Sequence, residues 1–158
     1  MNFFRTDSQA ALNSLIKAAR ETMDHYDDAT TLVKQNDIPA LDYAQLFSDI
    51  ATQRQDFISH LEDAIRAIGD LPAAPDADKE AGAMLIHHVA AMLKNNYAAD
   101  IILQRITAEE NLTNLIAEAK TVEPNAPYTT LLNEFSQHIA ETLTRLRAVH
   151  QQLMANQN

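Results

Sequence analysis

Apolar residues recur at intervals of three and four positions along four long stretches of this chain, and this spacing constrains the fold more than any other feature. Residues three and four apart lie on one face of an α-helix, so each stretch predicts a helix with a single apolar stripe. The chain has only two glycines, a composition that favours helix at nearly every position and predicts no sheet. Four one-sided helices bury their stripes against one another, and we therefore predict an all-α four-helix bundle that forms one domain over residues 1–158.

The predicted stripes supply the expected core. They contain Leu12, Leu15, Ile16, Ala19, Met23, Tyr26 and Val33 in the first helix; Tyr43, Leu46, Phe47, Ile50, Phe57, Leu61, Ile65 and Ile68 in the second; Ile101, Ile102, Leu112, Leu115, Ile116 and Ala119 in the third; and Tyr128, Leu131, Leu132, Phe135, Ile139, Leu146, Val149 and Leu153 in the fourth.

Turn-forming residues separate these helices. The first helix should begin after Asp7 or Ser8, either of which can accept a hydrogen bond from the free amides of the first turn. Gly69 should end the second helix, because glycine adopts the left-handed C-cap conformation at the lowest cost. Pro127 suits the first turn of the last helix. The predicted helices run to about residue 36, from the break at 36–39 to 69, from about 97 to 121, and from 127 or 128 to the polar tail.

The connection between the second and third helices, residues 70–96, is long enough to run the length of a bundle. We expect a linker over 70–78 and then a short helix over about 79–94, which would span roughly 24 Å. Such a connection sets the second and third helices parallel, as in a ferritin-like antiparallel four-helix bundle with a crossover. A simple up-down-up-down topology also fits the helix lengths.

Short motifs spread along most of the chain resemble those of a known family. They are LNSLI at 12–16 with Tyr26, QR at 53–54 with Phe57 and Leu61, His87 with LK at 93–94, AEE at 108–110 and RLR at 145–147. On these motifs the protein resembles a bacterial family of ferritin-like four-helix bundles known mainly as a domain of unknown function. The resemblance implies the bundle and its crossover and brings no established activity. Leu143 stands where the family has a histidine and His60 where it has an acidic residue, so two of the family's polar positions differ here.

The net charge of the chain limits the classes of partner that it is expected to bind. With 12 basic against 22 acidic residues the formal charge is -10, and no segment gathers basic residues into a stripe that would neutralise phosphates. We therefore expect no nucleic-acid partner, and like charge also disfavours binding to an anionic membrane surface. The acidity favours solubility or the recognition of a cationic partner or a metal ion.

Several classes of activity are disfavoured by what the sequence lacks. It has no cysteine, which excludes thiolate catalysis, disulfides and cysteine-ligated zinc or iron–sulfur sites. Its two glycines form neither a Gly-rich phosphate loop nor a nucleophile elbow. No apolar run reaches the roughly 20 residues that span a bilayer, and the start of the chain lacks a signal-peptide pattern. We expect a cytoplasmic protein and favour a non-enzymatic role.

A ferritin-like bundle raises the hypothesis of a carboxylate-bridged di-metal site. That site needs a Glu from each of two helices and a Glu-x-x-His pair from each of the others, all facing inward, and none of the nearest matches in this chain is a Glu-x-x-His pair. At about 100° per residue, only Glu109 lies well inside its stripe, while His138 and His60 lie on the flanks. We expect no metal cofactor; Glu109, His138 and His60 are the candidate ligands for iron, manganese or zinc. The remaining acids near the expected positions face outward, namely Glu21, Asp24, Asp56, Glu134 and Glu141.

Two arginines occupy stripe positions where an aliphatic residue is expected. Arg54 lies between Ile50 and Phe57, and Arg105 lies four residues before Glu109 on one helix face. Counting from the turns places Arg54 and Glu109 near the middle of the bundle, so we predict a contact between them within an interior polar cluster of Arg54, Arg105 and Glu109. Its simplest role is to fix the register of the helices. A small-anion pocket, or arginines that reach past the stripe to solvent, are the alternatives.

These features favour a non-enzymatic cytoplasmic helical-bundle protein that acts through its surface, as a homo-oligomer or by binding a protein partner. Phe3 and Phe4 fall outside the regular stripes, and we expect them to cover one end of the bundle or to join an interface. The alternative is a ferritin-like metal-binding protein, a di-iron or manganese carboxylate protein with an irregular or degenerate site.

Overall fold

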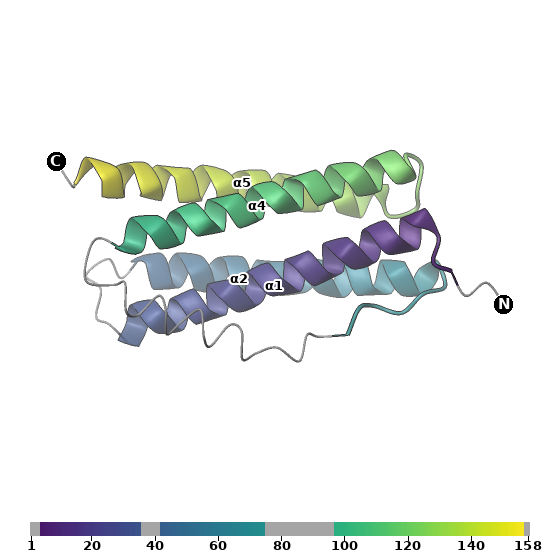
Figure 1. The fold of residues 1–158 in the computed structure, drawn as a ribbon, viewed down its shortest axis with the longest axis horizontal. Coiled ribbons are helices and arrows are strands. Elements are labelled where there is room, and N and C mark those ends of the chain that lie inside the picture. Colours follow the sequence, from purple (N-terminus) through teal and green to yellow (C-terminus); the bar gives the residue numbers. More distant parts are fainter. Residues whose placement is uncertain (1–3, 36–41, 75–96, 157–158) are drawn as a thin grey trace.

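The computed structural model describes residues 4–35, 42–74 and 97–156, and these ranges fold into a helical bundle (Figure 1). They contain no strand, so the prediction of an all-α four-helix bundle is confirmed for this part of the chain. Four features considered above lie outside the described residues: the break at 36–39, the predicted helix over 79–94 that contains His87, the residue Phe3, and the side chain of Val33. The described helices are α1 (Asp7–Gln35), α2 (Asp42–Ala67), α4 (Tyr97–Val122) and α5 (Thr129–Ala155).

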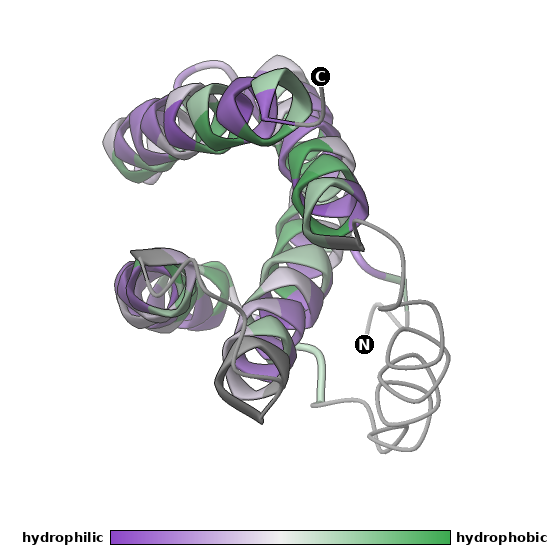
Figure 2. Cartoon of the chain, turned by 90° about the vertical axis from the view of Figure 1, so that its left-hand side faces the viewer, coloured by the Kyte–Doolittle hydropathy of each residue, from purple (hydrophilic) through white to green (hydrophobic). Residues whose placement is uncertain are grey.

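Around the bundle the helices follow the order α2, α1, α4, α5, as the view along the bundle shows (Figure 2). α1 packs closely on α2, α5 packs closely on α4, and α1 and α4 join the two pairs. α2 and α5 are the least closely packed neighbours. The bundle is therefore tightly closed on three sides and loosely closed on the fourth.

The apolar stripes meet inside this arrangement and form one core, as their periodicity predicts. Most of the stripe residues are buried, with Leu12, Leu15, Ile16, Ile50 and Leu61 fully inaccessible to solvent. The stripe residues that remain partly exposed are Met23, Tyr43, Phe57, Ile68, Leu115, Leu131, Val149 and Leu153.

The start of α1 is capped by Thr6. The Gln9 amide donates to Thr6 Oγ1 at 3.2 Å, and the Thr6 amide donates to Gln9 Oε1 at 2.9 Å. This reciprocal pair is a capping box, and it satisfies two amides at once. The prediction of a cap at Asp7 or Ser8 is wrong by one or two residues, because only Thr6 stands three positions before a residue that can reach back.

Gly69 ends α2 as predicted. Its φ is +84°, its amide donates to the Arg66 carbonyl at 3.0 Å, and the Asp70 amide donates to the Ile65 carbonyl at 3.1 Å. This pair of hydrogen bonds is a Schellman motif, which requires a left-handed residue that glycine adopts most readily.

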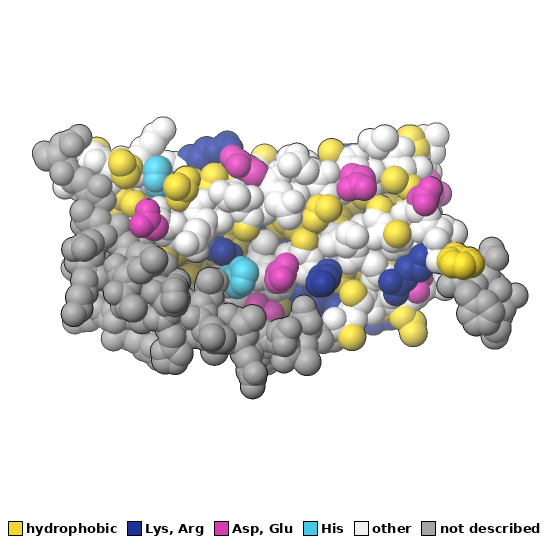
Figure 3. Space-filling view, viewed as in Figure 1, with side chains coloured by type: hydrophobic (Ala, Val, Ile, Leu, Met, Phe, Trp, Pro, Cys, Tyr) yellow, Lys and Arg dark blue, Asp and Glu magenta, His cyan; other side chains and the backbone are white. Residues whose placement is uncertain are grey.

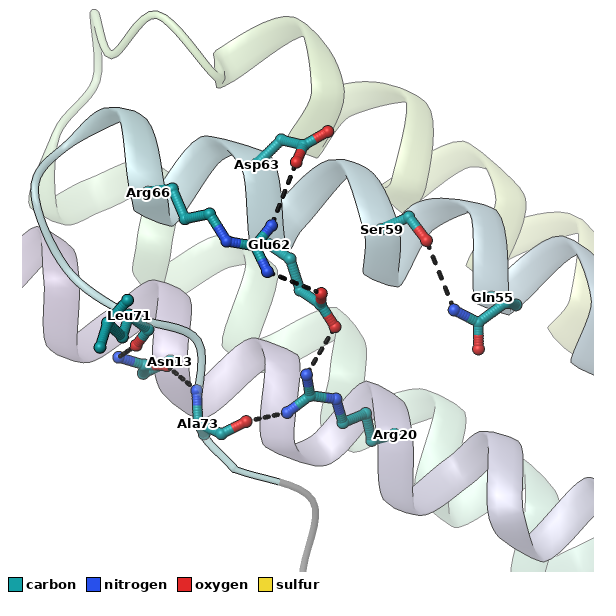
Figure 4. Close-up of polar contacts among 9 residues, drawn as sticks. All are labelled: Asn13, Arg20, Gln55, Ser59, Glu62, Asp63, Arg66, Leu71 and Ala73. Atoms are coloured by element: carbon teal, nitrogen blue, oxygen red, sulfur yellow. Dashed lines mark hydrogen bonds and ion pairs between the residues drawn. The ribbon is translucent and has the colours of Figure 1, made fainter.

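The segment that follows Gly69 turns back along α1 (Figure 4). The side chain of Asn13 binds the backbone of this segment. Asn13 Nδ2 donates to the Leu71 carbonyl at 3.3 Å, and Asn13 Oδ1 accepts from the Ala73 amide at 2.7 Å. Arg20 donates to the Ala73 carbonyl and also pairs with Glu62 of α2. A buried asparagine and one arginine thus fix the beginning of the long connection.

The ends of the helices meet through polar contacts. At one end of the molecule Gln9 Nε2 donates to the Ile68 carbonyl at 2.9 Å, and Ser8 Oγ donates to Glu123 at 2.7 Å. The first turns of α1 therefore lie beside the residues that follow both α2 and α4. Phe4 lies at this end and is 86% exposed, so the prediction that it covers the bundle is wrong, and a role in an interface stays a prediction.

None of the described helices has the length and apolarity needed to cross a membrane.

Candidate functional site

A buried ion pair lies at the centre of the bundle. Arg54 of α2 and Glu109 of α4 are both fully inaccessible to solvent, and Arg54 Nη2 donates to the two carboxylate oxygens at 3.0 and 2.8 Å. The predicted contact between these residues is confirmed. Removing one partner from a buried pair leaves an uncompensated charge at a cost of about 3–5 kcal/mol, so loss of either side chain would destabilise the contact between α2 and α4.

α1 completes the pair from a third side. Tyr26 donates its hydroxyl to Glu109 Oε1 at 2.8 Å, and Arg54 Nη1 donates to Thr22 Oγ1 at 2.6 Å. Burial, with the Glu109 charge adding to it, raises the pKa of Tyr26 well above its usual value, so the phenol stays protonated. The roles of Thr22 and Tyr26 were not predicted from the sequence. Their spacing of four on the α1 stripe was the available signal, because it places both polar groups on the core face.

Arg105 lies beside this network without an ion pair to Glu109. It is 6% exposed, its Cζ lies 5.7 Å from the centroid of the Tyr26 ring, and burial lowers its pKa. Its Nη1 and the Nε of Arg54 are buried without a hydrogen-bond partner. The interior position of Arg105 is as predicted, but it acts on the cluster through the aromatic face of Tyr26 and through the field of its charge.

His138 of α5 borders the same cluster. It is 8% exposed, and its Nε2 lies 3.5 Å from Arg54 Nη2. Burial lowers the pKa of His138 to about 4, and the Arg54 charge acts in the same direction. The imidazole is therefore neutral at pH 7, which suits a ring placed against a guanidinium.

The rings of Phe57, Phe135 and His138 stack between α2 and α5. The Phe57 ring lies 4.9 Å from that of Phe135 and 5.1 Å from that of His138. Phe135 is fully buried and Phe57 is partly exposed, so the stack extends from the core towards the surface.

The three candidate metal ligands do not come together. Glu109 is occupied by Arg54 and Tyr26, and His138 faces the Arg54 charge, which repels a cation. His60 is exposed on α2. Among the described residues, no three histidine, aspartate or glutamate side chains are placed to hold a metal ion.

A groove follows the loosely packed side of the bundle, between α2 and α5. It consists of two adjoining hollows of about 410 and about 490 Å³ that share His60 and Glu134. The first is lined by His60, Ala64, Ala67, Ile68, Pro127, Tyr128, Leu131 and Glu134, and the second by Gln53, Asp56, Phe57, His60, Glu134, Gln137, His138 and Glu141.

The two hollows differ in chemistry. We call the first the apolar half of the groove, because aliphatic side chains and the Tyr128 ring dominate its lining. We call the second the acidic half, because Asp56, Glu134 and Glu141 line it together with two glutamines and two histidines. Among the described residues that line the two halves there is no lysine or arginine. The three carboxylates are exposed, as their predicted outward positions require, and the groove gathers them on one surface.

The face of the molecule shown in Figure 3 lacks such a division. Acidic, basic and apolar side chains are interspersed over it, and none of these kinds forms a continuous patch. The groove is thus a local concentration of one sign of charge on a chain whose formal charge is already -10.

In comparisons with protein-family models, curated proteins and solved structures, none matches this chain. The resemblance to the ferritin-like family of unknown function therefore stays a prediction.

Proposed function

We propose that this chain is a non-enzymatic binding protein that takes a cationic protein partner into the groove between α2 and α5. The observation that carries the proposal is the lining of the groove, where exposed carboxylates stand beside apolar side chains and none of the described lining residues is a lysine or an arginine. Complementary charge directs the encounter of two proteins and disfavours wrong partners. Apolar area then contributes the affinity.

The same lining argues against self-association through the groove. Two copies that met groove to groove in parallel would bring Asp56, Glu134 and Glu141 of one copy against the same residues of the other, and in the antiparallel arrangement these carboxylates would lie against an apolar half without a basic partner. Like charges placed across an interface disfavour it. Of the two modes expected from the sequence, partner binding is therefore favoured over a homo-oligomer formed at this surface.

The centre of the bundle supports a binding role over catalysis. Its ionisable groups contact one another: Arg54 binds Glu109, Tyr26 binds Glu109, and neutral His138 faces Arg54. Neither half of the groove contains Arg54 or Glu109 in its lining, and both side chains are fully buried. We assign the cluster of Arg54, Arg105 and Glu109 to helix register. The rival hypothesis of an iron or manganese carboxylate protein gains no ligand set from the described residues.

We further propose the ferritin-like antiparallel topology with a crossover between α2 and α4. The contacts of Gln9 with Ile68 and of Ser8 with Glu123 support it, because they bring the start of α1 beside the ends of both α2 and α4. Two helices that both run antiparallel to α1 are parallel to each other, so the chain needs a long connection between them. The cytoplasm is our proposed compartment, which the absence of cysteine fits.

A selection with a displayed peptide library tests the proposed function. Peptides are enriched on the full chain and then measured on two variants, Ala67→Trp, which fills the apolar half, and Ala117→Trp, which adds the same side chain to the exposed face of α4. We expect enriched peptides to be basic, to lose binding to Ala67→Trp by tenfold or more and to keep binding to Ala117→Trp. Peptides that bind both variants equally would show that the groove is not the site.

A further inference from the structure

The length of the groove limits what can occupy it. Its lining extends from Gln53 on α2 to Ile68, just after that helix, and from Pro127, just before α5, to Glu141 on α5. At 1.5 Å per residue, the α2 wall is about 22 Å long, which equals about 15 residues of α-helix. An extended peptide would cover the same distance with only about 7 residues.

The walls favour a helix over a strand. Both are α-helices, whose backbone groups are hydrogen-bonded within each helix, so the groove has no sheet edge to which a strand could be added. A helix that lies in a groove needs small side chains where the backbones approach. Ala64 and Ala67 provide such positions in the apolar half, one turn apart on the α2 wall.

The order of the two halves along the groove determines where apolar and basic residues should lie along a bound helix. The apolar half includes Ile68 and Leu131, which belong to the apolar stripes and remain partly exposed. The acidic half lies next to it along both helices and carries Asp56, Glu134 and Glu141. An occupant that satisfies both halves has apolar residues along one half of its length and lysines or arginines along the other.

We propose that the groove binds one α-helix of about 15 residues that is divided along its length into an apolar half and a basic half. This inference rests on the proposed function and names the partner more narrowly: a helical segment of another protein, placed between α2 and α5. Glu134 is the central specificity residue, because it lines both halves and faces the junction between the two parts of the bound helix.

Four synthetic peptides of equal length test this inference by fluorescence anisotropy on the full chain. The first has segregated apolar and lysine halves, and the second has the same composition with the two kinds mixed along the helix. The third replaces lysine with glutamate, and the fourth places a proline at the centre of the first. We expect the segregated peptide to bind at least tenfold more tightly than the mixed and proline peptides, and the glutamate peptide not to bind.

Matched variants locate the contact. Glu134→Gln with Glu141→Gln should weaken the segregated peptide fivefold or more, whereas Glu21→Gln with Glu118→Gln, an equal loss of charge outside the groove lining, should change it less than twofold. All four side chains are exposed, so each double variant is expected to fold. Equal weakening by both pairs would show that only the overall charge matters and would overturn the inference.

The remaining outcomes separate this inference from the proposed function. If the mixed and proline peptides bind as tightly as the segregated one, and all depend on Ala67, the groove binds cationic peptides but not a divided helix. If no designed peptide binds while the library yields groove-dependent sequences of another kind, the inference fails and the function stands. If neither binds, both fail. A chain that dimerises in sedimentation and becomes monomeric in Ala67→Trp would instead assign the groove to a second copy.

Discussion

Glu109 and Glu134 are both glutamates on helices of one bundle, and their surroundings are opposite. Glu109 is fully buried and accepts hydrogen bonds from Arg54 and Tyr26. Glu134 is exposed on the wall of the groove, and no hydrogen bond or ion pair joins it to another side chain in the described part of the chain. A buried carboxylate must be paired within the fold, so it serves stability and register. An exposed unpaired carboxylate contributes little to stability and is available to a partner.

The largest expected effect breaks the buried side of this comparison. Glu109→Ala should lower the free energy of unfolding by about 3–5 kcal/mol, because Arg54 is left as an unpaired buried charge. Glu118→Ala, on the exposed face of the same helix, is the control and should change stability by less than about 0.5 kcal/mol. Urea unfolding followed by circular dichroism gives both values. A loss below about 1 kcal/mol for Glu109→Ala would contradict a paired and dry centre.

The next effect concerns His138, which borders both the buried cluster and the groove. Its pKa is about 4 in the folded chain against 6.5 for the free side chain, so the unfolded chain binds the proton more readily. The stability that comes from keeping His138 neutral is therefore fully present above pH 6.5. It is lost as the pH falls towards 4. Between pH 7 and 5 we expect this residue to account for about 2 kcal/mol of the loss.

Urea unfolding at these two pH values checks the contribution of His138. His138→Gln should reduce the pH dependence, and His60→Gln, at an exposed position of the groove, should leave it nearly unchanged. A smaller dependence should remain in His138→Gln, because burial also lowers the pKa of His25. An identical pH profile for His138→Gln and the unaltered chain would show that His138 is not held neutral by its surroundings.

The smallest effect concerns an exposed ion pair. Arg147 Nη2 lies 2.9 Å from Glu110 Oε1, and both side chains are about half exposed. Arg147→Ala should lower the free energy of unfolding by less than about 1 kcal/mol, since solvent and salt screen such pairs. Differential scanning calorimetry of Arg147→Ala and Glu109→Ala, measured side by side, gives the ratio of the two losses in stability. A loss comparable to that of Glu109→Ala would remove the distinction between buried and exposed carboxylates.

The sequence predicted the helices and the central pair because both depend on local signals. Gly69 and Pro127 mark turns by their own backbone properties, and Arg54 and Glu109 stand out as charges within apolar stripes. The hydroxyls of Thr22 and Tyr26 gave a weaker signal. Tyrosine is common in apolar stripes, and only the relative height of α1 and α4 shows that its hydroxyl meets a carboxylate.

The groove could not be predicted, because it depends on the spacing between two helices that are distant in sequence. Leu131 and Ile68 belong to regular stripes and are indistinguishable by pattern from the buried Leu132 and Ile65. They remain partly exposed because α2 and α5 are less closely packed than the other neighbours. His60 and His138 both fall on stripe flanks, yet His60 is exposed and His138 is buried. Periodicity gives the direction of a side chain and not the distance to the helix opposite.

The division of the groove into an acidic half and an apolar half separates the rate of encounter from the time of residence. Attraction between exposed charges is screened over a Debye length of about 10 Å at 0.1 M salt. In the proposed complex, a basic helix is therefore drawn to Asp56, Glu134 and Glu141 fastest in dilute salt, and more slowly as ionic strength rises. Contacts with Ile68 and Leu131 carry no charge and govern how slowly the helix leaves. Salt thus acts mainly on arrival at this surface, and apolar complementarity on departure.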